Sequence, residues 1–250
     1  MKYLNYGKVG FFLSLMIFCV GCCSKKIAPK YAADYNNTSV FLVIKSVEAK
    51  IPVEIEDTGE IENVPISVST GTGASISSNP NYSDILTAGH VCAEFDVPEV
   101  LAQSIQTNFL LLDIAGNNYS ADLVAIDHES DLCLLRIYTP TKPAKVSEKK
   151  LKSGDKVFYS GYPLGIYNPG SLHHFSGYFS GTDPNGYSMY SLPAAPGASG
   201  SPIFDEDDKL VGIISAIPEE FSHLSIGAGT QRIKTFLFLS ADCTKFCVNQ

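Results

Sequence analysis

The chain has 250 residues, of which 45% are hydrophobic and 18% charged, and this balance predicts a packed globular core. The formal net charge is −8, which argues against a nucleic-acid partner because phosphate binding needs a basic surface. The 20 glycines and 14 prolines, among short runs rich in β-branched residues, favour a β-rich fold with many turns.

The N-terminal segment differs from the rest of the chain. A start with two lysines leads into the apolar run "VGFFLSLMIFCVG", which is shorter than the roughly 20 residues of a membrane-spanning helix. We therefore expect residues 1–22 to be a secretory signal peptide and the protein to be exported. Gly21 before Cys22 resembles the lipobox of bacterial lipoproteins, which implies a lipid on Cys22 and a membrane anchor, with Cys23 as a second candidate. A plain signal peptide of a secreted protein is the alternative.

Short β-type runs follow a polar tether, which we assign to residues 23–37. The runs "TNFLLLDIAG" and "NYSADLVAID" flank an "AGNN" turn and predict a hairpin. "DLCLLRIY" is apolar nearly throughout, as in a strand buried on both faces. Only "TQRIKTFLF" near the end has helical spacing. About a dozen strands predict packed β-barrels or a sandwich in one domain, residues 38–240, followed by a tail, residues 241–250.

Four of the seven cysteines lie beyond the N-terminal segment. Export would permit disulfides. A bridge between Cys92 and Cys133 and a local bridge between Cys243 and Cys247 are both compatible with the sequence, and Cys133 could also be a small buried hydrophobe. Spacing alone does not choose among these pairings. The histidines do not stand at zinc-ligand spacing with these cysteines, so we expect neither a metal nor a cofactor.

Three stretches carry residue types suited to nucleophilic catalysis. In "ILTAGHV", small residues let the backbone turn tightly so that His90 faces a cleft, although alone it reads as a core histidine. In "DHESDLCLL", Asp131 opens a buried strand, where a carboxylate is costly without donors, although alone it reads as a cap. In "PAAPGASGSPIF", Gly197 and Gly200 flank Ser199 and permit a sharp turn. The N–H groups of Gly197 and Ser199 could then converge on an oxyanion.

The chain order of these three residues separates the known classes of serine hydrolase. An α/β-hydrolase runs Ser, Asp, His, and a subtilisin runs Asp, His, Ser. The order His90, Asp131, Ser199 fits only the chymotrypsin-like arrangement. That arrangement also agrees with the β-rich composition.

The segments "TAGHV", "DHESDLCLL" and "GASGSP" resemble the signature segments of trypsin-like serine peptidases, with the bacterial HtrA/Deg proteases and glutamyl endopeptidases as nearest branches. "SGYPLG", "HHFSGYFSG" and "GAGTQRIKTFL" resemble further family segments, so the resemblance covers about residues 38–240. It implies an all-β, chymotrypsin-like fold of two packed six-stranded antiparallel β-barrels with a short C-terminal helix. It also implies a serine endopeptidase that acts on proteins or peptides.

The resemblance further implies a role for each site residue. Ser199 would attack the scissile carbonyl, His90 would take its proton, and Asp131 would hold the imidazole. The backbone N–H groups of Gly197 and Ser199 would form the oxyanion hole, and residues 214–217 would pair with the substrate as an added strand. The primary pocket would be uncharged and would select a small or medium apolar side chain, with walls made by Pro193, Ala194, Ala195, Ile214, Ser215 and Ala216.

Three departures from the family bear on regulation and specificity. Ala198 stands where animal digestive members have an aspartate, which excludes activation through that ion pair. Ile214 stands where glutamyl endopeptidases have a histidine, which argues against glutamate specificity. We also expect no PDZ domain after the peptidase domain, unlike in most HtrA proteins. The alternative function is a non-catalytic or latent peptidase-fold lipoprotein that binds proteins.

Overall fold

A computed structural model describes residues 39–51, 62–94, 104–217 and 221–247. These residues belong to one compact unit, residues 35–250. The expected signal peptide, the tether and the lipidation candidates Cys22 and Cys23 lie outside the described residues. In the part of the chain that is described, no helix is both long and apolar enough to cross a membrane.

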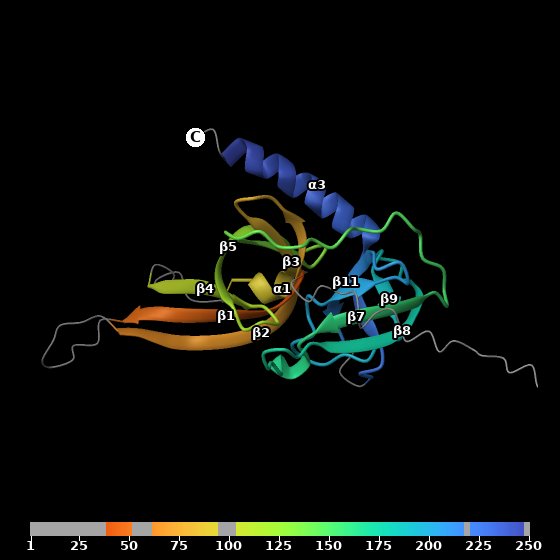
Figure 1. The fold of residues 1–250 in the computed structure, drawn as a ribbon, viewed down its shortest axis with the longest axis horizontal. Helices are drawn as coiled ribbons and strands as arrows, with labels where there is room; N and C mark the ends of the chain where they lie inside the picture. Colours follow the sequence, from red (N-terminus) through yellow and green to blue (C-terminus); the bar gives the residue numbers. More distant parts are fainter. Residues whose placement is uncertain (1–38, 52–61, 95–103, 218–220, 248–250) are drawn as a thin grey trace, which may run out of the picture. The chain divides into compact units, whose positions relative to one another are not determined.

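The N-terminal half of the unit forms a closed barrel of antiparallel strands in the order β1-β2-β3-β6-β5-β4 (Figure 1). A short helix, α1, follows β3. The predicted hairpin is confirmed, because β4 and β5 pair directly. The elements of this barrel are β1 (Val40–Ile51), β2 (Glu62–Ser78), β3 (Ser83–Ala88), α1 (Gly89–Cys92), β4 (Ile105–Leu112), β5 (Asn118–Asp127) and β6 (Leu132–Ile137).

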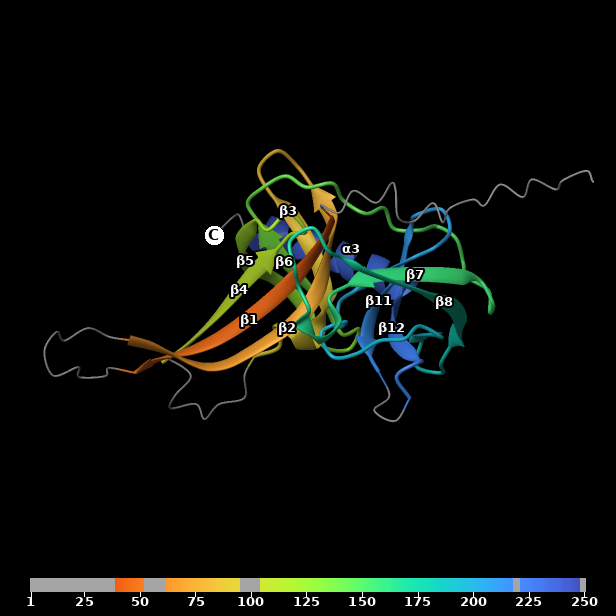
Figure 2. The same cartoon turned by 60° about the horizontal axis from the view of Figure 1, so that its bottom comes forward.

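The C-terminal half forms a second closed barrel in the order β10-β11-β12-β9-β8-β7. Figure 2 shows β7, β8, β11 and β12 beside the strands of the first barrel. The predicted all-β fold of two six-stranded barrels with a C-terminal helix is therefore confirmed. Its elements are β7 (Lys156–Gly161), η3 (Pro163–Gly165), β8 (His173–Thr182), β9 (Ser188–Tyr190), β10 (Pro202–Phe204), β11 (Leu210–Ala216), β12 (Ser225–Gly229) and α3 (Thr230–Cys247).

Strand β6 shows why the two barrels pack as one unit. Its side chains alternate between two apolar clusters: Cys133 and Leu135 face the core of the first barrel, whereas Leu132 and Leu134 join a cluster shared with the second barrel. The strand is buried on both faces, as its continuous apolar run predicts. Helix α3 adds Ile233 to the shared cluster.

Helix α3 is longer than the segment with clear helical spacing. It continues to Cys247, past the boundary placed at residue 240. Residues 241–247 contain neither glycine nor proline, so no strong stop signal ends the helix there.

A disulfide joins Cys92 of α1 to Cys133 of β6, which settles one of the open pairings. The side chains of Cys243 and Cys247 lie outside the described part. The bond closes a loop with a sequence separation of 41 residues. It connects the segment that carries His90 to the strand that follows Asp131.

Replacing both Cys92 and Cys133 with alanine should lower the free energy of unfolding. For a loop of this size, chain entropy predicts a loss of about 3–4 kcal/mol. Urea denaturation of the oxidised protein and of the double variant measures the difference. The reduced wild-type protein serves as a control and should approach the double variant, and equal midpoints for all three samples would contradict the prediction.

Candidate active site

His90 lies in α1, directly after the fully buried strand β3. Its side chain is half exposed, whereas the preceding Gly89 is buried. A Cβ atom on Gly89 would lie 3.0 Å from the backbone and carboxylate of Asp131, so glycine permits the close approach of the two segments. The small residues before His90 therefore place its imidazole beside Asp131.

Asp131 occupies the last position of the turn before β6, in the left-handed region at φ 49°. Aspartate tolerates this region better than most residues, and such outliers cluster at functional sites. Its Oδ1 accepts the backbone N–H of His90 at 2.8 Å, and its Oδ2 lies 2.9 Å from Nδ1 of the imidazole. The donors required by a carboxylate at the mouth of a buried strand thus both come from His90.

The environment of Asp131 keeps its carboxyl ionised. Burial raises the pKa, but the hydrogen bonds and charge of His90 outweigh it, and the pKa falls below its ordinary value. An ionised carboxylate only accepts hydrogen bonds, so Nδ1 of His90 must carry the proton. In the neutral imidazole, Nε2 is then the free acceptor.

The segment around Ser199 consists of two consecutive tight turns, residues 195–198 and 198–201, each closed by a 2.9 Å backbone hydrogen bond. The third residue of each turn is a glycine with positive φ, Gly197 at 89° and Gly200 at 85°. Pro196 precedes Gly197, which is the sequence preference of a type II turn. The glycines flanking Ser199 are therefore required by the backbone.

The backbone donors of this segment divide into two groups. The N–H groups of Ala198, Gly200 and Ser201 donate to carbonyl oxygens of the chain. Within the described residues, the N–H groups of Gly197 and Ser199 have no acceptor. Backbone donors in a mostly buried loop are normally satisfied, so these two are available to an external acceptor.

The carbonyls of the same segment are held from outside it. The oxygen of Pro196 accepts the N–H of Leu164 at 2.5 Å, and that of Ser199 accepts the N–H of Thr72 at 2.7 Å. The oxygen of Gly197 accepts the hydroxyl of Thr72 at 3.0 Å. The segment that carries Ser199 is thus docked on both η3 and the first barrel.

The structure brings His90 and Asp131 into direct contact and places Ser199 half-buried on the second barrel. The imidazole of His90 forms hydrogen bonds with Asp131. Among the described residues, no hydrogen bond joins the imidazole to Ser199. The disulfide between Cys92 and Cys133 fixes the segments that carry the first two residues.

The residues expected to form the walls of the primary pocket have diverse surroundings. Ile214 is fully buried in the core of the second barrel, and the buried hydroxyl of Ser215 has no hydrogen-bond partner among the described residues. The carbonyl of Pro193 accepts the hydroxyl of Tyr159 at 2.8 Å, and the N–H of Ala194 donates to Ser222. The remaining two are Ala195, which is half-buried, and Ala216, which is exposed.

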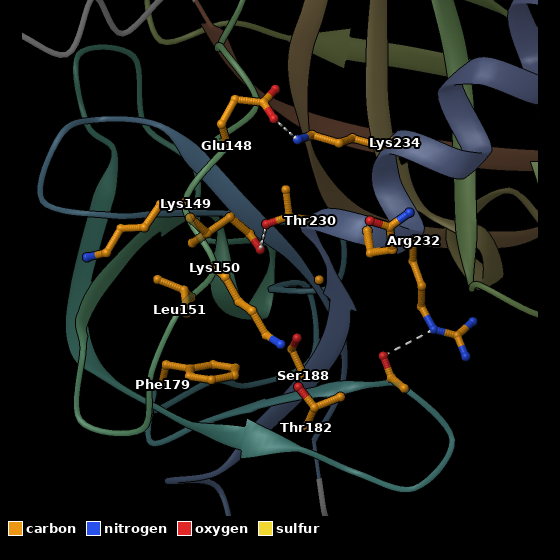
Figure 3. Close-up of a pocket in the computed structure, with 14 residues that line it drawn as sticks. Glu148, Lys149, Lys150, Leu151, Phe179, Thr182, Ser188, Thr230, Arg232 and Lys234 are labelled. Carbon is orange, nitrogen blue, oxygen red and sulfur yellow. Dashed lines mark hydrogen bonds and ion pairs between the residues drawn. The ribbon is translucent and has the colours of Figure 1, made fainter.

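A separate cavity of about 440 Å³ lies between residues 148–151 and the start of α3 (Figure 3). Lys234 pairs there with Glu148 at 2.6 Å, and Arg232 binds backbone carbonyls and stacks over Tyr187. Two of the cationic side chains that line the cavity, Lys234 and Arg232, are therefore already bound to other groups of the protein. None of the residues singled out for catalysis lines it.

Comparison with known proteins identifies the family. The model of the trypsin-like peptidase domain matches residues 71–213, more than half of the chain. The periplasmic pH-dependent serine endoprotease DegQ of Escherichia coli is 26% identical over 181 residues, which cover 67% of this chain and 36% of DegQ. The uncharacterized protein y4bJ of Sinorhizobium fredii is 25% identical over 136 residues, 52% of this chain and 21% of y4bJ. The chain thus spans well under half the length of both relatives.

Solved structures agree on the fold. Structures of the HtrA-type protease AlgW, one of a variant with a tripeptide and one with a decapeptide, give TM-scores of 0.59 and 0.61 at 18% identity. They cover 80% of this chain and 58% and 64% of the AlgW chains. The fold is chymotrypsin-like. The chain belongs to the trypsin-like serine peptidase family, near its HtrA branch.

Proposed function

We propose that the protein is a serine endopeptidase. The observation that carries this proposal is the His90–Asp131 pair, with Nδ1 of the imidazole bound to an ionised carboxylate, in a chain of the trypsin-like family. Nε2 of His90 takes the proton from the hydroxyl of Ser199 as its oxygen attacks the scissile carbonyl. The same proton then passes to the leaving amine, while Asp131 stabilises the imidazolium.

The two unoccupied backbone donors supply the second part of the mechanism. The N–H groups of Gly197 and Ser199 bind the oxygen that becomes negative as the tetrahedral intermediate forms. Losing one such donor costs about 10²- to 10³-fold in rate in a comparable site. No metal or cofactor has a part in this chemistry.

The substrate is a protein or peptide chain bound in extended form. Residues 214–217 would pair with the substrate as an added strand, and along this segment exposure rises from the buried Ile214 to the exposed Ala216. No charged side chain occurs among the residues assigned to the primary pocket, which supports a small or medium apolar side chain before the cut. The bound tripeptide and decapeptide of AlgW support the peptide class.

The same proposal includes export. A disulfide is typical of an oxidising compartment, and the relative DegQ is named as periplasmic. An N-terminal signal peptide with a lipid on Cys22 would anchor the protein to a membrane, and a plain signal peptide would release it.

A fluorophosphonate probe tests the proposed activity. The purified full-length protein should take up one phosphonate per chain, and peptide mapping by mass spectrometry should place it on Ser199, because only an activated serine reacts. Heat-unfolded protein serves as the control and should not be labelled. A folded protein that takes no label, or is labelled at another serine, would refute the proposal and favour a latent, peptide-binding protein.

A further inference from the structure

We propose that Thr72, on β2, is a positioning residue that keeps the N–H groups of Gly197 and Ser199 free for the oxyanion. The inference rests on the proposed peptidase function. It concerns a residue that no motif in the sequence marks.

Thr72 is fully buried, and each of its polar atoms has a partner. Its N–H donates to the carbonyl of Ser199 at 2.7 Å, and its own carbonyl accepts the hydroxyl of Thr87 at 2.7 Å. Its hydroxyl donates to the carbonyl of Gly197 and accepts the N–H of Tyr162, both at 3.0 Å. One residue of the first barrel therefore binds the serine turn twice and the approach to η3 once.

These contacts constrain the peptide planes of the serine turn. A trans peptide holds its C=O and its N–H in opposite directions, so fixing a carbonyl fixes the N–H of the next residue. Thr72 holds the carbonyls of Gly197 and Ser199, which directs the N–H groups of Ala198 and Gly200 into internal hydrogen bonds. The N–H groups of Gly197 and Ser199 belong to the peptides that precede these two. With the Gly197–Ala198 and Ser199–Gly200 peptides fixed, the two N–H groups stay without internal partners.

The hydroxyl of Thr72 also supports the third anchor of the turn. It accepts the N–H of Tyr162, two residues before Leu164, whose own N–H holds the carbonyl of Pro196. That carbonyl belongs to the peptide that carries the N–H of Gly197. Removing the hydroxyl would therefore loosen two peptide planes of the turn, the Pro196–Gly197 peptide and the Gly197–Ala198 peptide.

Close packing leaves little room for a substitute arrangement. A Cβ atom on Gly200 would lie 1.9 Å from the carbonyl oxygen of Thr72. The turn and β2 are thus in direct backbone contact, and a displacement of Thr72 reaches the turn without intermediate side chains.

The test compares Thr72→Val, which keeps the shape and the backbone bond, with Thr72→Ser, which restores the hydroxyl. We expect Thr72→Val to lower kcat on a peptide substrate by about 10- to 100-fold with little change in KM, the size of loss that small misplacements produce. The affinity for a peptide boronate, which mimics the tetrahedral state, should fall in parallel. Thr72→Ser should stay within about threefold of wild type.

Ser83→Ala is the matched control. Ser83 is equally buried in the first barrel, and its hydroxyl makes two hydrogen bonds, to Ser78 and Thr139, at the end of β3 away from His90. It should lower the unfolding midpoint without lowering kcat. An equal loss of kcat in Ser83→Ala, or an unchanged kcat in Thr72→Val, would overturn the proposal.

Hydrogen exchange separates this proposal from the proposed function. In Thr72→Val, the hydrogen-bonded amides of Ala198, Gly200 and Ser201 should exchange at least about tenfold faster than in wild type, whereas Ser83→Ala should leave them unchanged. This measurement needs no activity. If the wild-type protein took no fluorophosphonate, the peptidase proposal would fail, while exchange would still decide whether Thr72 holds the turn.

Discussion

Replacing Ser199 with alanine should reduce kcat by about 10⁶-fold, as removal of the nucleophile does in other serine proteases. The change deletes the atom that bonds to the substrate carbonyl. The fold should be unaffected, because no hydrogen bond of the Ser199 side chain occurs in the part of the chain that the structure describes. The measurement is the hydrolysis of a peptide substrate, beside the unfolding midpoint of both proteins.

The residual rate of this variant is informative. The oxyanion donors and substrate binding remain, so hydrolysis about 10³- to 10⁴-fold above the uncatalysed rate should persist. Ser201→Ala, in the same segment, is the matched control, because its hydroxyl has no partner among the described residues. A wild-type rate in Ser199→Ala would show that another residue is the nucleophile.

Replacing Asp131 with asparagine should reduce kcat by about 10⁴-fold, the loss caused by this change in a related catalytic triad. The amide can donate a hydrogen bond to Nδ1 of His90, which would move the proton to Nε2. Nε2 could then no longer accept the proton of Ser199. Asp127→Asn is the control, because Asp127 ends β5 and its carboxylate accepts the backbone N–H of Glu129 rather than contacting His90.

The same variant has a predictable effect on the pH dependence of stability. The folded pKa of Asp131 lies below its ordinary value of 3.8. Its stabilising contribution is therefore fully present above that value and is lost as the pH falls through the lower folded pKa. The difference in unfolding free energy between wild type and Asp131→Asn should be constant near neutral pH and shrink in acid. A difference that grows in acid would contradict this assignment.

The sequence predicts those parts of the molecule that depend on neighbouring residues. The hairpin of β4 and β5, the two-faced burial of β6 and the glycines beside Ser199 each follow from a local pattern. The chain order of His90, Asp131 and Ser199 selects the class of fold, because few folds share it.

Other features depend on contacts between distant segments. The hydroxyl of Thr72 reaches Gly197, 125 residues away, only after the two barrels have packed. In the sequence, Thr72 is one small residue between two glycines, in a strand of alternating small and apolar residues. The sequence is compatible with several cysteine pairings, and the bond between Cys92 and Cys133 depends on the packing of α1 against β6.

The division of the proposed site between two barrels would keep the peptidase inactive until both barrels have folded. His90 and Asp131 both belong to the first barrel, and Ser199 belongs to the second. A chain in which only one barrel has folded would hold either the proposed base without its nucleophile or the nucleophile without its base. Such a chain could not cleave its neighbours or itself, so the proposed peptidase would become active only once its folding is complete.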